Sequence, residues 1–163
     1  MTGGFDKIDR KILDLLQERD RPVAVLAEEV GLSQTPCWRR IRRMENAGII
    51  RERVTLVDPK KMGVPMTIFI SVIAPRHETA WLTKFRKLLE SIPEIVEAYR
   101  LTGTVDYILK AMVPDIATYD KVYKTMIEQL EFTQVSSSIS MEELKFTTAV
   151  PTNHLISKET ALV

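Results

Sequence analysis

Two helix-forming segments separated by a glycine lie within residues 23–47, and they limit the fold of this chain more than any other feature. Residues 23–30 gather apolar side chains on one face of a short helix. Gly31 then suits a left-handed helix stop, and Ser33 is a good N-cap for the following helix, over residues 34–47. Two helices joined by so tight a turn are typical of a helix-turn-helix unit.

The second helix has two contrasting faces. Cys37, Ile41 and Met44 recur at i, i+4 and i+7 and form its buried stripe. Residues 36–53 contain six arginines and two glutamates, and most of these arginines lie away from that stripe. Such a charge run often coats only a solvated helix face, but here it lies on the helix that would enter the major groove of DNA. We therefore favour DNA binding and expect the contacts to come from Ser33, Gln34, Thr35, Trp38, Arg39, Arg42 and Arg43.

A further helix and a strand complete the N-terminal domain. Asp6 and Asp9 resemble a capping pair, and the helix that follows them should end before Pro22. Residues 49–56 alternate in polarity, which predicts a strand and therefore a small wing.

The remaining sequence shows a different pattern. Strands are expected at residues 64–74, 95–101, 107–113 and 134–144, and helices at 81–92 and after a cap at Asp115. The order β-α-β-β-α-β indicates a ferredoxin-like sheet with both helices on one face. The predicted fold class is therefore α+β, an N-terminal winged helix-turn-helix followed by a ferredoxin-like βαββαβ domain. The expected boundaries are 1–53 for the DNA-binding domain, 54–64 for a hinge, and 65–163 for an oligomerisation and effector-sensing domain.

One face of this sheet would be left without helices. The first strand is apolar on that side as well, so a monomer would expose a hydrophobic patch. Pairing of two sheets in a homodimer is the simplest remedy. Alternatively, residues 145–163 could cover part of the face, with 146–150 as an added strand, although this tail is too short to cover it all.

Other features exclude several classes of protein. No apolar run approaches the length of a membrane span, the N-terminus lacks a secretory signal, and Cys37 has no disulfide partner, so we expect a cytoplasmic protein. Burial of Cys37 in helix packing is favoured over a redox role. His77 and His154 lack acidic or cysteine partners at ligand spacing, so no metal is expected. No cofactor is expected either.

Several stretches together resemble the Lrp/AsnC (leucine-responsive, asparagine-responsive) family of transcription regulators. In the N-terminal part they are residues 6–13, 30–37, 39–45 and 48–50. In the C-terminal part they are Leu101-Thr102-Gly103-Thr104-Val105-Asp106-Tyr107 and Met141-Glu142-Glu143. The match covers nearly the whole chain in the family's order.

The resemblance implies a dimer that assembles further, commonly to an octamer, and a small amino acid bound between dimers as effector. Transferred to this chain, the effector site would comprise Leu101, Thr102, Gly103, Thr104, Asp106 and Tyr107, together with Ser136 and Ser138. Family members can carry larger side chains on that fourth strand, so the identity of the effector stays open. From the residues alone, a simple turn at Gly103 with Asp106 as its cap is the favoured interpretation, and the resemblance reverses that preference.

Three alternatives remain beside an effector-modulated regulator of double-stranded DNA. One is a ligand-independent architectural regulator, and another is an oligomeric module that binds only small molecules. The third is an enzyme with an accessory domain. The sequence offers no phosphate-binding glycine loop, no paired catalytic carboxylates and no nucleophile beside a base, so we do not expect an enzyme.

Overall fold

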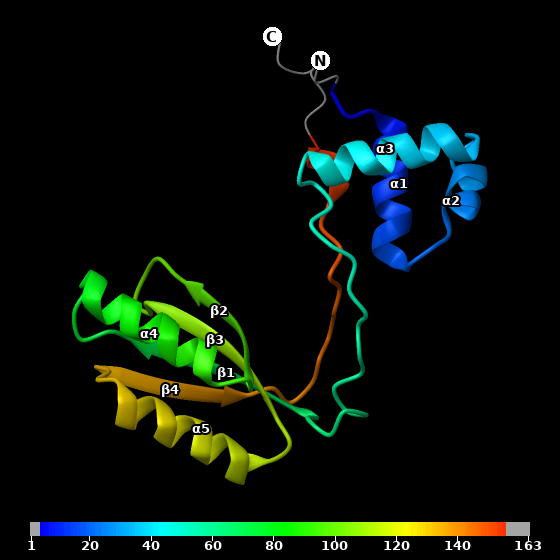
Figure 1. Cartoon of the computed structure of the whole chain (residues 1–163). Coiled ribbons are helices and arrows are strands. Elements are labelled where there is room, and N and C mark those ends of the chain that lie inside the picture. The colour runs from blue at the N-terminus through cyan, green and yellow to red at the C-terminus, as the bar shows by residue number, and fades with distance from the viewer. Residues whose placement is uncertain (1–3, 156–163) are drawn as a thin grey trace. The chain divides into compact units, whose positions relative to one another are not determined.

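The computed structural model describes residues 4–155, which form two separate units (Figure 1). One unit contains the described residues up to Thr55 together with those from Lys145 onward. The other unit spans Leu56–Leu144. None of the helices in the described part of the chain is long and apolar enough to cross a membrane.

Three α-helices build the first unit, α1 (Lys7–Glu18), α2 (Val23–Glu29) and α3 (Gln34–Asn46), and a 3-10 turn, η1 (Thr152–His154), follows in its C-terminal segment. The predicted cap is confirmed, because the Asp6 carboxylate accepts from the backbone N–H groups of Ile8 and Asp9. The Asp9 carboxylate in turn accepts from the Asp6 backbone N–H. Gly31 has a φ of 70°, the left-handed conformation that lets the chain leave α2 and enter α3 at once. The core between the helices contains Ile12, Leu13, Leu26, Ala27, Cys37, Ile41 and Met44.

No strand forms where the wing was expected. Residues 51–57 have no regular secondary structure, and all strand pairs among the described residues belong to the sheet of the second unit. The alternating pattern was therefore a misleading signal. A strand needs a neighbour for its backbone N–H and C=O groups, and in residues 4–155 this segment has none.

The C-terminal segment packs against α1. The side-chain amide of Gln17 donates to the Val150 carbonyl at 3.1 Å and accepts from the Val150 N–H at 2.7 Å. Arg10 donates to the Leu155 carbonyl at 2.8 Å, and Leu155 contacts the apolar core of the first unit. The alternative in which residues 146–150 add a strand to the sheet is wrong, because their described backbone is irregular and the segment bonds α1. The sequence-based boundary placed this tail in the second domain; its last eight residues lie outside the described range.

Removing the Gln17 amide should loosen this segment. Gln17→Ala eliminates both hydrogen bonds to Val150, and we expect the first unit to lose about 1 kcal/mol of unfolding free energy. Chemical denaturation followed by circular dichroism measures this change. Lys7→Ala, an exposed position on the same helix, is the control and should unfold like the wild type. Equal stability of both variants would show that the contact between the tail and α1 contributes nothing.

The second unit is a four-stranded antiparallel sheet with two helices. Its elements are β1 (Met66–Ile73), α4 (Thr79–Ser91), β2 (Ile95–Arg100), β3 (Tyr107–Val113), α5 (Ile116–Gln129) and β4 (Gln134–Ile139). The strand order β2-β3-β1-β4 confirms the ferredoxin-like prediction (Figure 1). β4 stops at Ile139 instead of continuing to 144, although the Ser140 N–H still donates to Thr67.

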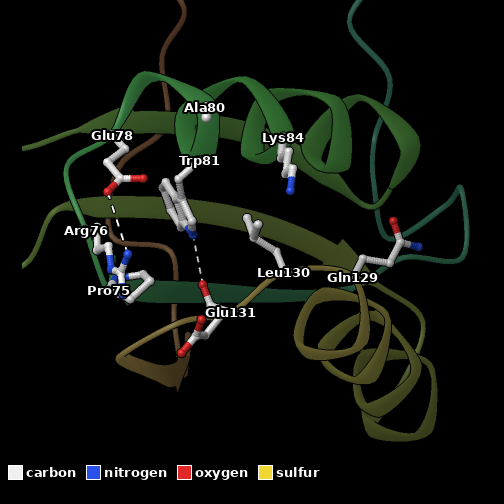
Figure 2. Close-up of a pocket in the computed structure, with 9 residues that line it drawn as sticks. All are labelled: Pro75, Arg76, Glu78, Ala80, Trp81, Lys84, Gln129, Leu130 and Glu131. Atoms are coloured by element: carbon white, nitrogen blue, oxygen red, sulfur yellow. Dashed lines mark hydrogen bonds and ion pairs between the residues drawn. The ribbon is translucent and has the colours of Figure 1, made fainter.

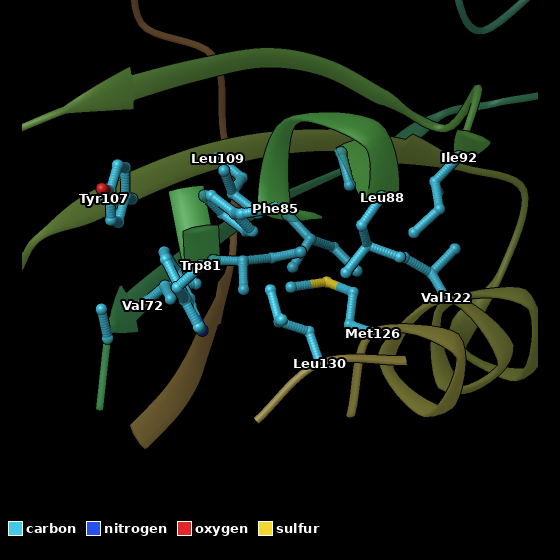
Figure 3. Close-up of a cluster of buried hydrophobic side chains, with 14 of the residues drawn as sticks. Val72, Trp81, Phe85, Leu88, Ile92, Tyr107, Leu109, Val122, Met126 and Leu130 are labelled. Atoms are coloured by element: carbon cyan, nitrogen blue, oxygen red, sulfur yellow. The ribbon is translucent and has the colours of Figure 1, made fainter. Parts of the chain in front are cut away.

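Both helices cover the same face of the sheet. Ile68, Ile70 and Val72 of β1 are fully buried under them, as is Leu109 of β3. Figure 3 shows α4 contributing Trp81, Phe85 and Leu88, and α5 contributing Val122 and Met126, to this core; Leu130, just after α5, joins them. The Trp81 and Phe85 rings stack with centroids 4.8 Å apart.

The opposite face carries no helix within the described residues. In the antiparallel register, Phe69 of β1 lies between Lys110 of β3 and Ser138 of β4. The Phe69 side chain is 40 % exposed. Lys110 in turn pairs with Glu97 at 3.0 Å, so this face combines apolar side chains with a polar edge.

Candidate DNA-recognition surface and effector loop

The predicted division of α3 into two faces is present in the structure. Cys37, Ile41 and Met44 are buried, whereas the opposite face exposes Thr35, Trp38, Arg39 and Arg42. The Trp38 side chain is 49 % exposed, which is unusual for a tryptophan without a function on the surface. The apolar periodicity thus fixes which side of α3 packs and which side faces outward.

The two arginines on the exposed face differ in their surroundings. The guanidinium of Arg42 lies 5.5 Å from the ring centroid of Trp38 and pairs with Glu45 at 2.9 Å. Arg39 makes no ion pair or hydrogen bond with any residue in the described part of the chain. Its five N–H donors are free for an external acceptor.

Three polar residues at the start of α3 accompany this face. Ser33, Gln34 and Thr35 are all exposed. Ser33 is the N-cap by backbone geometry, but its hydroxyl makes no capping hydrogen bond among the described residues. Hydroxyl and amide groups at a helix N-terminus suit contacts to phosphate oxygens.

Arg43 has a partner that the sequence did not reveal. Its guanidinium bonds the buried carboxylate of Asp9 at 2.6 Å and lies 5.1 Å from the Phe5 ring centroid. Arg40, which the sequence analysis did not single out, bonds the same carboxylate at 2.9 Å. The sequence signal for these ion pairs is the i, i+3 spacing within each like-charged pair, Asp6/Asp9 and Arg40/Arg43. Without knowledge of how the helices pack, that spacing does not show which acid pairs with which arginine.

These charges affect two neighbouring groups. Burial alone would raise the pKa of Asp6, but the Asp9 N–H and the Arg40 guanidinium outweigh it and hold this pKa below its usual value. Burial raises the pKa of the Cys37 thiol, with the positive charge of Arg40 opposing the shift. A buried, protonated thiol is a poor nucleophile, which agrees with the packing role predicted for Cys37.

The loop between β2 and β3 is closed around Asp106. The Asp106 carbonyl accepts from the Leu101 N–H at 2.8 Å, and its own N–H donates to Val72 at 3.1 Å. One carboxylate oxygen accepts from the Ala74 N–H at 2.8 Å, and the other lies 3.7 Å from His77. Gly103 has a φ of 122° at the turn. Asp106 therefore ties the loop to the end of β1.

The structure brings together only part of the predicted effector set. Leu101, Thr102, Gly103 and Thr104 are exposed in this loop beside Asp106. Tyr107 instead lies in the core, with its ring centroid 5.0 Å from that of Phe85. Ser136 and Ser138 are exposed on the helix-free face of β4, across β1 from β3, and not in the loop.

A shallow pocket occupies another part of the second unit. It lies where α4 begins and α5 ends, and the Trp81 indole N–H donates to the Glu131 carbonyl at its base, 2.9 Å away (Figure 2). None of the predicted effector residues lines it; its walls are Pro75, Arg76, Glu78, Ala80, Trp81, Lys84, Gln129, Leu130 and Glu131.

Comparisons with known proteins agree with both halves of this arrangement. Residues 5–51 match a family model described as winged helix-turn-helix DNA-binding, and residues 67–150 match one described as the Lrp/AsnC ligand binding domain. The chain is 45 % identical over 152 residues to the glutamate uptake regulatory protein of Zymomonas mobilis, with 93 % of each chain covered.

Two solved structures resemble the whole chain. A crystal structure of an AsnC family transcriptional regulator from Agrobacterium tumefaciens is 48 % identical with a TM-score of 0.90, covering 93 % of this chain and 100 % of that one. A transcriptional regulator from Neisseria meningitidis in complex with L-Met is 34 % identical with a TM-score of 0.88, covering 93 % and 99 %.

Proposed function

This chain belongs to the Lrp/AsnC family of transcriptional regulators, and we propose that it binds specific DNA sites through α3 and senses a small amino acid through its second unit. The observation that carries the proposal is the exposed face of α3, where an unpaired arginine and a tryptophan-stacked arginine lie side by side on a helix-turn-helix unit. Activity in the cytoplasm follows from the proposed DNA target.

Arg39 is our candidate for base recognition. A guanidinium without an internal partner can form a bidentate pair with a guanine edge in the major groove. Arg42 contacts Trp38 and Glu45, and beside Arg39 it is our candidate for a second base or phosphate contact. Ser33, Gln34 and Thr35 at the helix start orient the unit on the phosphate backbone.

The loop at residues 101–106 is our candidate effector site. Backbone N–H groups around Gly103 and Thr104 are exposed and suit a carboxylate, and the Asp106 oxygen near His77 suits an ammonium group. L-methionine and L-glutamate are the first ligands to test, since one relative was solved with L-Met and another regulates glutamate uptake. Tyr107 is buried, and Ser136 and Ser138 lie on β4, away from the loop. A second copy of this chain would therefore have to complete the site.

An effector prediction tests this assignment. Calorimetry should detect binding of at least one amino acid, and Asp106→Asn should weaken it about tenfold or more, because the amide can still accept from Ala74 but no longer attracts an ammonium. Asp120→Asn, an exposed aspartate on α5, is the matched control. Equal affinity in both variants would show that Asp106 is not the ammonium partner.

The same ligand should change DNA binding. In gel-shift titrations with the region upstream of its own gene, a coupling of about 1–3 kcal/mol would alter affinity roughly 5- to 150-fold. Specific binding that no amino acid changes would favour the alternative, a ligand-independent architectural regulator. Absence of any preference for this DNA over an unrelated duplex would contradict the proposed function itself.

A further inference from the structure

Four charged residues join the first turn of α1 to the middle of α3, and we name them the Asp9 clamp: Asp6, Asp9, Arg40 and Arg43. The Asp9 carboxylate lies at its centre with no exposed surface. One oxygen accepts from Arg40 at 2.9 Å. The other accepts from Arg43 at 2.6 Å and from the Asp6 N–H at 2.9 Å.

A buried carboxylate is stable only when its oxygens are paired. Here the two pairs reach α3 at positions 40 and 43, almost one helical turn apart. Arg40 also bonds Asp6, the N-cap of α1, at 2.7 Å, where a negative charge is favoured by the helix dipole. Two attachment points on one side of α3 oppose both sliding and rotation of that helix against α1.

The rotation of α3 decides which side chains DNA can meet. Successive residues differ by about 100° around a helix, so even a partial turn would move Arg39 and Arg42 away from a base edge. The apolar stripe alone allows some freedom, since aliphatic contacts are not directional. Charge-assisted hydrogen bonds with fixed geometry remove that freedom.

We propose that Arg40 and Arg43 are positioning residues, which set the rotation of α3 through Asp9, and that they do not serve as phosphate ligands. The proposal rests on the proposed DNA-binding function. It divides the arginines of α3 into two classes: Arg39 and Arg42 face outward, whereas Arg40 and Arg43 point to α1.

Asp9→Asn separates the two roles, because they predict opposite changes in DNA binding. If Arg40 and Arg43 are phosphate ligands, removing their internal competitor frees both, and affinity for DNA stays equal or rises. If they are positioning residues, preference for the specific duplex over an unrelated one should fall at least about fivefold. Asp120→Asn, which changes the net charge identically on α5, is the control and should keep the wild-type preference.

A second variant keeps the proposal testable if Asp9→Asn unfolds. Arg43→Ala should lower specific affinity but leave the dependence of affinity on salt unchanged, whereas loss of one phosphate contact lowers that slope by about 0.9. A slope reduced by about one, or tighter binding by Asp9→Asn, would overturn the proposal. A wild-type protein without preference for any duplex would overturn the proposed function, and this inference with it.

Discussion

The double variant Arg39→Ala, Arg42→Ala should bind its specific duplex little better than unrelated DNA while remaining as stable as the wild type. An arginine–guanine pair contributes about 1–3 kcal/mol of discrimination. A two-fold dimer presents the face twice, so the loss should be on the order of 3 kcal/mol or more, over 100-fold in affinity. Stability should change little, because among the described residues these arginines form one ion pair, between Arg42 and Glu45, at the surface.

Fluorescence anisotropy with a labelled specific duplex and an unrelated one, both at the same salt concentration, measures this change. The matched control is Arg86→Ala, Arg100→Ala, which removes two exposed arginines from the second unit. It should keep the wild-type ratio of specific to unrelated binding. If the α3 double variant also keeps that ratio, the recognition surface lies elsewhere.

Local signals were enough to predict the helices of the first unit. Asp6 and Asp9 mark a cap, Gly31 marks a turn, and Cys37, Ile41 and Met44 mark the inner face of α3, each through interactions within a few residues. The same holds for the order of strands and helices in the second unit, where periodicity and one capping residue, Asp115, identify the elements. Such features depend on backbone sterics and on the spacing of apolar residues, and both can be inferred from neighbouring residues in the sequence.

Features that depend on distant partners were missed or misread. The alternating residues 49–56 suggested a strand, but a strand exists only where a second one pairs with it. Partial cover of the sheet by the tail was the alternative to sheet pairing, and only the geometry shows that the Gln17 amide bonds Val150. Likewise, the ion pair between Arg43 and Asp9 was missed, because the two residues are 34 positions apart along the chain.

The effector loop shows the same limit in another form. The resemblance places Tyr107 in the effector set together with the loop residues, and side chains on a strand alternate between faces. Asp106 precedes the first residue of β3, and Tyr107 then points to the helix side, into the core with Trp81 and Phe85. A site described by a continuous run of residues therefore splits into an exposed part and a structural part.

The helix-free face of the sheet is where we expect two copies of the chain to pair. Phe69 is 40 % exposed at the centre of this face, beside the serines of β4, and neither helix of the second unit lies on this side of the sheet. Burying a phenylalanine contributes about 1.5–3 kcal/mol, and a two-fold interface counts it twice. In a two-fold dimer, replacing Phe69 by a charged residue would also bury two like charges close to the symmetry axis.

Phe69→Asp should therefore convert a dimer into a monomer at micromolar concentration, with a dissociation constant raised on the order of 100-fold or more. Analytical ultracentrifugation of the full chain measures the change. Ile127→Asp is the control, because Ile127 is 46 % exposed on α5, on the other side of the unit, and it should leave the dimer intact. A wild-type monomer, or a Phe69→Asp dimer as tight as the wild type, would show that the sheets do not pair through this face. Since specific DNA binding by a two-fold dimer requires both α3 helices, the monomer should also lose most of its specific affinity.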